Sequence, residues 1–179
     1  MRQIVVTEFI SLDGVIEAPS WTAPYWNDEI AKFKGAETTA SDALLLGRVT
    51  YQGFAAAWPQ SQDEGAPYFN GVRKYVVSTT LDEATWNNSV LIKDNIAEAI
   101  AKLKQQDGQD IIVYGSGALV QTLMQHHLVD RLRLLVYPVV IGTGKRLFEG
   151  GIPATLKLLE CQALSGGVVA LIYQPEPAS

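Results

Sequence analysis

The sequence predicts a single α/β domain built on a mixed β-sheet with an antiparallel end. Three observations support this fold class. Apolar segments of strand length alternate with segments of helical periodicity along the 179 residues. Several of the strand segments are apolar at nearly every position, which is typical of strands covered on both faces. The last two strand segments are separated only by Ser165-Gly166-Gly167, which predicts a hairpin.

Eight segments have the length and the apolar character of strands. The run Ile111-Ile112-Val113-Tyr114 is an example of a strand with no polar face. The eight predicted strands are 3–10, 42–46, 73–78, 88–93, 110–114, 130–137, 155–163 and 167–174.

Helices are predicted between these strands, at 27–40, 48–57 and 117–127 and after Asp94 or Asn95. In the last of these helices Ile96, Ile100 and Leu103 share one face, and Gly108 ends it. Two connections, 11–26 and 58–71, are longer than usual and polar or aromatic, which indicates a functional or mobile role. We expect one domain over 1–175 and a frayed tail over 176–179.

Composition excludes several classes of protein. With 14 Lys and Arg against 19 Asp and Glu, the net charge of −5 does not suit non-specific nucleic-acid binding. The single cysteine, Cys161, excludes an intrachain disulfide and is expected to be an inert core residue of a strand. His126-His127 has no third ligand at metal spacing, so no metal site is expected. No segment resembles a membrane span or a targeting leader, and we expect a cytoplasmic protein.

Three predicted strands end in residues that suit an anion. Glycine lets backbone N–H groups approach a phosphate, a helix N-terminus favours negative charge, and Arg48 at a helix start opposes the dipole unless an anion is present. Each group could instead form an ordinary turn or cap. Because ligands of open α/β sheets bind beyond the carboxyl ends of strands, the three ends together favour a dinucleotide. The groups are Gly47, Arg48 and Thr50; Ser78, Thr79 and Thr80; and Gly115, Ser116 and Gly117.

Three acidic residues could donate a proton. Glu8 interrupts the apolar strand 3–10, either as a functional acid with a raised pKa or as a strand-end residue that faces water. Asp28 and Glu29 lie in the first turn of the helix at 27–40. There they either complement the helix dipole or face a pocket.

The order and spacing of these motifs resemble the dihydrofolate reductase-like superfamily. The sequence is most similar to the reductase domain at the C-terminus of the riboflavin-biosynthesis deaminase–reductases and to its stand-alone relatives. The matching segments are 11–16, 42–51, 77–80, 114–117 and 138–144. The resemblance implies an eight-stranded, mostly parallel mixed sheet flanked by about four helices, a cis peptide between Gly115 and Ser116, and an NADPH site.

The resemblance also implies roles for individual residues. Arg48, Thr50 and the hydroxyls of 78–80 would hold the adenosine-side phosphates, and Gly47 would allow close approach. A loop over the nicotinamide would consist of Asp13, Gly14, Val15 and Ile16. The pyrophosphate would be cradled by Gly115, Ser116, Gly117, Ala118, Leu119 and Val120.

The substrate is less closely defined by the sequence. Glu29 matches the pterin-contacting acid of dihydrofolate reductases. The aromatic residues Trp21, Tyr25 and Trp26 either line a site for a flat heterocycle or anchor their loop. We therefore expect an NADPH-dependent reductase of a pyrimidine- or pterin-like ring. The alternatives are dihydrofolate reductase itself, a non-catalytic NADPH-binding module, and a homodimer built on exposed strands whose main role is assembly.

Overall fold

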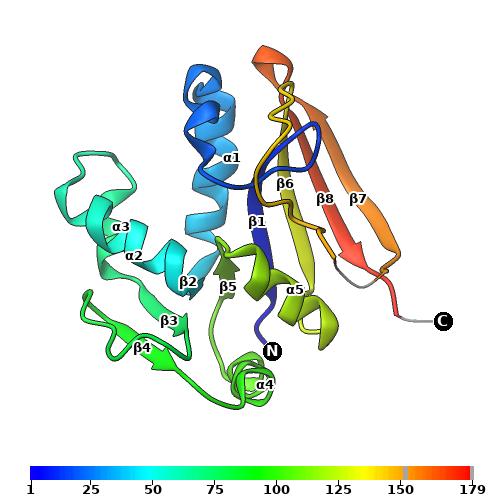
Figure 1. The fold of residues 1–179 in the computed structure, drawn as a ribbon. Coiled ribbons are helices and arrows are strands. Elements are labelled where there is room, and N and C mark those ends of the chain that lie inside the picture. Colours follow the sequence, from blue (N-terminus) through cyan, green and yellow to red (C-terminus); the bar gives the residue numbers. More distant parts are fainter. Residues whose placement is uncertain (151–152, 178–179) are drawn as a thin grey trace.

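A computed structural model describes residues 1–150 and 153–177 and contains one eight-stranded sheet (Figure 1). The strands are β1 Ile4–Ser11, β2 Ser41–Gly47, β3 Arg73–Val77, β4 Ser89–Ile92, β5 Asp110–Val113, β6 Arg131–Tyr137, β7 Leu156–Ala163 and β8 Val169–Pro175. Their order across the sheet is β4-β3-β2-β5-β1-β6-β8-β7. All eight predicted strands are confirmed.

Pairing in the sheet is parallel from β4 to β6 and antiparallel at the end. Strand β8 runs antiparallel to β6, and β7 runs antiparallel to β8 across a turn at Ser165–Gly167. The predicted C-terminal hairpin and mixed sheet are therefore confirmed.

Helices cover both faces of the sheet (Figure 1). The α-helices are α1 Asp28–Thr39, α2 Arg48–Ala57, α3 Ala66–Gly71, α4 Ile96–Gln105 and α5 Gly117–Gln125. Alternate residues of β1 join different cores: Ile4 and Val6 pack with α4 and α5, whereas Val5 packs with α2 and α3. This alternation follows from the two-residue period of a strand.

Helix α3 lies in the segment 58–71, which the sequence predicts to be a loop. Phe69 of α3 is buried and stacks on Trp58 with ring centroids 4.0 Å apart, so aromatic packing overrides the polar character of the segment. In the other long connection, Pro19–Tyr25 forms a 3-10 helix. Asn95 precedes α4 as predicted, but it has a left-handed backbone and makes no side-chain cap.

The prediction that Cys161 belongs to the core is wrong, because this residue is exposed. It lies on β7, which is an edge strand and has an exposed side chain at nearly every position. Leu158 and Leu159 of β7 are also exposed. The homodimer expected on exposed strands stays a prediction.

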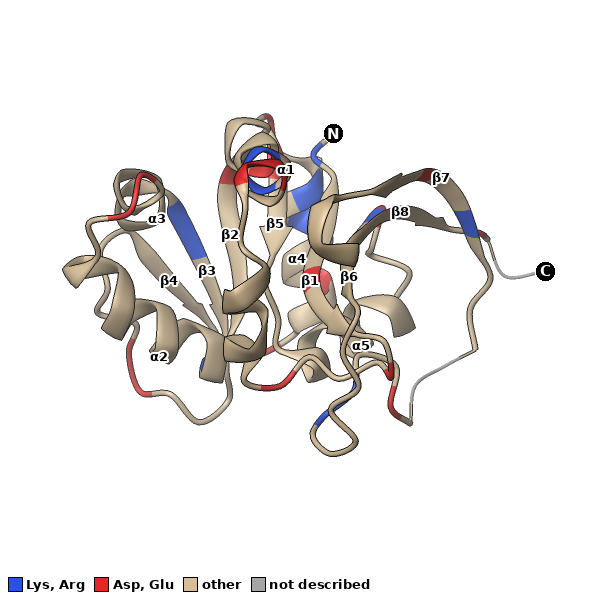
Figure 2. Cartoon of the chain, turned by 90° about the horizontal axis from the view of Figure 1, so that it is seen from above, with Lys and Arg blue, Asp and Glu red and all other residues tan. Residues whose placement is uncertain are grey.

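Lys and Arg are scattered over the sheet, α1 and the loops rather than gathered on one element (Figure 2). Among the described residues, no helix combines the length and the apolar character that a membrane span needs. Glu176 of the expected tail donates its N–H to the Thr155 carbonyl at 2.9 Å, and residues 178–179 lie outside the described part of the chain.

Candidate active site

The central strands separate at the carboxyl end of the sheet. Pairing between β1 and β5 ends at Val6 and Val113, whereas β1 continues beside β6 as far as Ser11. Beyond β5 the chain turns away into α5. A cavity of about 100 Å³ lies at this point, and we call it the β1–β5 cavity. It is lined by Thr7, Glu8, Phe9, Pro19, Lys34, Phe54 and Tyr114.

Glu8 contributes a carboxyl group to the wall of the β1–β5 cavity. Its Oε1 is buried and has no hydrogen-bond partner among the described residues. A Cβ atom on Gly115 would lie only 3.1 Å from this oxygen, so glycine makes room for it. Burial raises the pKa of Glu8 to about 8, although the positive charge of Lys34 opposes the rise. Burial of the carboxyl supports the alternative in which Glu8 has a raised pKa, and its role as a proton donor stays a prediction.

Lys34 reaches the cavity from α1 and belongs to a buried charge network. Its Nζ lies 2.6 Å from Glu37 Oε2 and donates to Thr7 Oγ1 at 2.7 Å. The other carboxylate oxygen, Glu37 Oε1, accepts from Thr7 Oγ1 at 2.8 Å and from Arg133 Nε at 3.0 Å. Burial lowers the pKa of Lys34, and the Glu37 carboxylate opposes this by stabilising the ammonium form.

The structure places the other two predicted acids outside the cavity lining. Glu29 Oε2 accepts a 2.6 Å hydrogen bond from the Ser165 N–H in the β7–β8 turn, and hydrogen bonding to Ser165 lowers the pKa of this exposed carboxyl. Asp28 is exposed at the start of α1, where Asn27 caps the helix. These contacts favour structural roles for both residues. A proton-donating role for Glu29 or Asp28 is not supported by them and stays a prediction.

Two helix N-termini meet beside the cavity, at the ends of β2 and β5. The Gly47 N–H donates to the Gly115 carbonyl at 2.9 Å, and a Cβ on Gly47 would lie 2.6 Å from Ser116 Oγ. Neither Gly47 before α2 nor Ser116 before α5 caps its helix with a side-chain hydrogen bond. The implied cis peptide between Gly115 and Ser116 is present.

Arg48 stands at the start of α2, exposed, with Gln52 as its hydrogen-bond partner at 3.2 Å. Thr50 lies on the first turn of the same helix, and its Oγ1 would be 3.3 Å from a Cβ on Gly115. Uncapped N–H groups, a guanidinium and a hydroxyl thus share one edge of the sheet. This donor set fits the diphosphate of a dinucleotide.

The remaining residues predicted to contact the cofactor differ in whether their side chains are free to bind a ligand. Ser78 Oγ accepts from the N–H groups of Thr80 and Leu81, so it caps the strand end, whereas Thr79 and Thr80 are exposed. On α5, the side chains of Leu119 and Val120 are buried in the core. The first turn of α5, which includes Gly117 and Ala118, can therefore offer mainly its backbone to a ligand.

The loop predicted to cover the nicotinamide is tied to the segment before β7. Asp13 accepts from Ser11 Oγ at 2.6 Å and from the N–H groups of Ile141 and Gly142, and these bonds lower the pKa of Asp13 to about 2. Arg146 Nε donates to the Asp13 carbonyl at 3.0 Å. Gly14, Val15 and Ile16 follow, and the Ile16 N–H donates to the Lys145 carbonyl. Asp13 thus holds the loop in place.

The predicted aromatic residues anchor their loop. Trp21 and Tyr25 each meet Tyr137 edge to face with centroids 5.6 Å apart, and Trp26 is exposed. None of the three lines the β1–β5 cavity.

The cavity lining also contains Lys34, which the sequence analysis did not single out. Lys34 shares a helix face with Ile30 and Glu37, and two charged residues on that buried face were the signal that could have revealed it.

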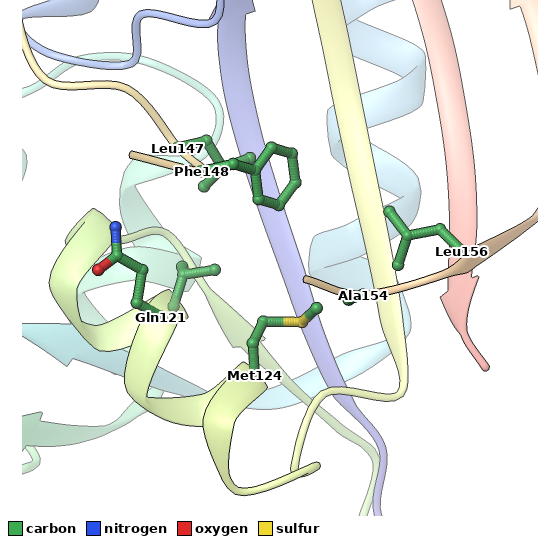
Figure 3. A pocket seen from close by; sticks show the side chains of 7 residues that line it. Gln121, Met124, Leu147, Phe148, Ala154 and Leu156 are labelled. Carbon is green, nitrogen blue, oxygen red and sulfur yellow. The ribbon is translucent and has the colours of Figure 1, made fainter. Parts of the chain in front are cut away.

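A second hollow, which we call the α5 pocket, lies between α5 and the segment that leads into β7 (Figure 3). Its volume is about 200 Å³. Its lining is apolar except for Gln121, whose Nε2 donates to the Glu149 carbonyl at 2.7 Å. The lining residues are Val120, Gln121, Met124, Leu147, Phe148, Ala154 and Leu156.

Comparison with known proteins identifies the family. The model of the RibD C-terminal domain family matches residues 2–170. The chain belongs to the RibD C-terminal domain family. An uncharacterized relative, YyaP of Bacillus subtilis, is 31% identical over 178 residues, which are 96% of this chain and 94% of YyaP. The resemblance inferred from the sequence motifs is therefore confirmed.

Solved structures confirm the fold of this RibD C-terminal domain. A pyrimidine reductase-like protein of Corynebacterium diphtheriae matches with a TM-score of 0.74 and 12% identity, covering 99% of this chain and 93% of that one. The deaminase/5-amino-6-(5-phosphoribosylamino)uracil reductase of Thermotoga maritima matches with a TM-score of 0.69 and 15% identity, and the match covers 97% of this chain and 56% of that one. Dihydrofolate reductase of Enterococcus faecalis, complexed with NADP(H), matches with a TM-score of 0.59 and 13% identity, and the match covers 98% of this chain and 97% of that one. The chain thus has the dihydrofolate reductase-like fold.

Proposed function

We propose that this protein is an NADPH-dependent reductase of a flat, nitrogen-containing ring. The observation that carries the proposal is the buried, unpartnered carboxyl oxygen of Glu8 in the β1–β5 cavity, beside two uncapped helix N-termini. The family and the names of the similar structures support a reductase of the kind that acts on pyrimidines.

The N-termini of α2 and α5 would hold the diphosphate of the cofactor, and Arg48 would hold its charged adenosine end. NADPH, when bound, supplies a hydride from its nicotinamide ring. The loop fixed by Asp13 would close over that ring. The chain's own task is then to position the acceptor ring and to exclude water from the β1–β5 cavity.

Glu8 would supply the proton that follows the hydride. A carboxyl with a pKa of about 8 is protonated at neutral pH yet can lose its proton, which suits a general acid. Its unpartnered Oε1 has no structural bond to break before it can meet a substrate. Glu29, by contrast, already binds the Ser165 N–H, which gives no support to dihydrofolate reductase as the activity.

Cofactor binding tests the proposal. We expect NADPH to quench tryptophan fluorescence with saturation, and Arg48→Ala to weaken NADPH binding about tenfold, the effect of one charge-assisted contact. Arg131→Ala is the matched control, because Arg131 is exposed at the opposite end of the parallel strands. Absence of NADPH binding to the unaltered protein would contradict the proposal.

Turnover separates an enzyme from a binding module. With NADPH bound, single-turnover oxidation can be followed at 340 nm after addition of either a pyrimidine carrying an exocyclic ribosylamino group or dihydrofolate. We expect the pyrimidine to react. Binding without oxidation by any such ring would instead support a non-catalytic NADPH-binding module.

A further inference from the structure

Lys34 lines the same cavity as Glu8 and holds a positive charge at its wall. Its ammonium has three N–H groups, of which two are engaged, by Glu37 and by Thr7. The ammonium also lies 4.7 Å from the ring centroid of Tyr114, a contact that stabilises a cation without using an N–H group. The charge of Lys34 is therefore fixed in place beside the carboxyl group that the proposed reaction needs.

The charges around this cavity balance only when Glu8 is ionised. Lys34 of α1 and Arg133 of β6 share one carboxylate, that of the buried Glu37. Burial raises the pKa of the Tyr114 phenol, which follows β5, well above its usual value, so this group stays neutral. With Glu8 protonated, the cluster has one positive charge in excess, whereas with Glu8 ionised two cations face two carboxylates. This difference is felt strongly in surroundings of low dielectric constant.

The unpartnered oxygen of Glu8 is the place where this balance acts. Glu8 Oε1 and Thr50 Oγ1 lie 3.1 and 3.3 Å from the position that a Cβ on Gly115 would take, so α2 brings an uncharged hydroxyl to this side. Glu8 Oε1 itself has no hydrogen bond among the described residues. Burial favours the neutral carboxyl, and the charge of Lys34 favours the carboxylate. Glu8 can thus both hold a proton and release one.

We propose that Lys34 is a positioning residue for proton transfer, whose ammonium supplies the counter-charge for the Glu8 carboxylate that is left once the proton has gone to the substrate. This inference rests on the proposed reductase function and deepens it. In that reaction the acceptor double bond gains a hydride on one atom and the Glu8 proton on the other. Solvent returns a proton to Glu8 after the product has left. Glu37 divides its negative charge between Lys34 and Arg133, and so sets how much of the Lys34 charge reaches Glu8.

The pH at which Glu8 titrates measures the effect of Lys34 without cofactor or substrate. It can be followed in the full chain by ¹³C NMR of the glutamate carboxyls, where the Glu8 signal is the one lost in Glu8→Gln. Lys34→Met removes the charge, so the midpoint should rise by about one pH unit, which is a tenfold tighter hold on the proton. Lys34→Arg keeps the charge, and its midpoint should stay close to that of the unaltered protein. Glu37→Gln exposes Glu8 to more of the positive charge and should lower the midpoint.

The direction of the change in Lys34→Met separates this role from a purely structural one. A variant that merely loosened the cavity would admit water and lower the midpoint, because water stabilises the carboxylate. Lys32→Met, which alters an exposed lysine on the same helix, is the matched control and should change nothing. The proposal is overturned if the midpoint falls or stays the same in Lys34→Met, or if Lys34→Arg raises it equally. Should Lys34→Met fail to fold, Lys34→Gln takes its place with the same expected rise.

The rate of single-turnover NADPH oxidation shows whether this charge matters to the reaction. The rate should fall above the Glu8 midpoint, and in Lys34→Met that fall should move to higher pH together with the midpoint. At lower pH, Lys34→Met should be slower by about three- to tenfold, because a weaker acid gives up its proton less readily. An unchanged rate profile would overturn the role in proton transfer. Absence of oxidation in the unaltered protein would instead contradict the reductase proposal, while the titration midpoints would still decide whether Lys34 controls Glu8.

Discussion

The α5 pocket and the β1–β5 cavity differ in the chemistry of their walls more than in their size. The α5 pocket has about twice the volume of the β1–β5 cavity, yet its wall is apolar and its amide group is already bonded to a carbonyl. The smaller cavity is lined by the carboxyl group of Glu8 and the amino group of Lys34. Chemistry requires such groups, so the smaller hollow is the active-site candidate.

The difference also has a cost in stability. Burying Lys34, Glu37 and Arg133 around one cavity requires removing water from three charges, which only good mutual geometry offsets. The α5 pocket needs no such compensation. A region that is costly to fold and rich in polar groups is typical of a functional site.

The largest effect is expected from Glu8→Gln. This change keeps the shape of the side chain but removes the proton donor, so single-turnover NADPH oxidation should slow by about 10²- to 10⁴-fold. Binding of NADPH should be retained. Glu29→Gln should alter the rate by less than about twofold, because that carboxyl is bonded to Ser165. The reverse pattern would restore Glu29 as the acid.

Breaking the charge network should destabilise the fold next most strongly. Glu37→Gln leaves the charges of Lys34 and Arg133 without their carboxylate, which should cost about 3–5 kcal/mol in urea unfolding. Glu98→Gln breaks the exposed pair with Lys102 and should have a far smaller effect, because water screens that pair. Equal effects of the two changes would mean that the Glu37 network is not buried in solution.

A smaller effect should appear in the pH dependence of stability. Glu8 has a pKa of about 8 in the folded protein and about 4.5 when unfolded, so the folded state binds more protons between these values. Stability from this group is complete below about pH 4.5 and is lost as pH rises through 8, by about 3 kcal/mol between about pH 5 and 7.5. Urea unfolding of Glu8→Gln should lack this decline. An identical decline in both proteins would assign it to other groups.

The smallest effect is expected in the α5 pocket. Phe148 is half exposed, so Phe148→Ala should reduce stability by less than about 1.5 kcal/mol and leave NADPH oxidation unchanged. Thermal unfolding measures the change in stability, and the single-turnover rate measures NADPH oxidation. A large loss of turnover with an intact fold would place function in this pocket as well.

Local patterns in the sequence predicted the fold well. Strands, the C-terminal hairpin and four of the helices follow from apolar runs, periodicity and turn residues. Helix α3 escaped prediction because its stability comes from Phe69 packing on Trp58, a contact between residues eleven positions apart. The exposure of Cys161 escaped because strand order, which makes β7 the edge, is not a local property.

The site was only partly predictable. The helix starts at Arg48 and Gly117 were found because glycine and arginine there have specific physical uses. Lys34 was missed because its burial depends on Glu37 and on Arg133, which lies about a hundred residues further along the chain. Glu29 was a candidate from its place in the first turn of a helix and was favoured by the resemblance, but its bond to Ser165 depends on the position of a distant turn.

The pKa of Glu8 tests the central claim most directly. A ¹³C NMR titration of the glutamate side-chain carboxyls, with the Glu8 signal assigned by its loss in Glu8→Gln, would follow this group alone. We predict a midpoint near pH 8 in the folded protein, because burial keeps the carboxyl protonated. A midpoint near the ordinary glutamate value of about 4.5 would mean that Glu8 is ionised at neutral pH and would contradict its role as the acid.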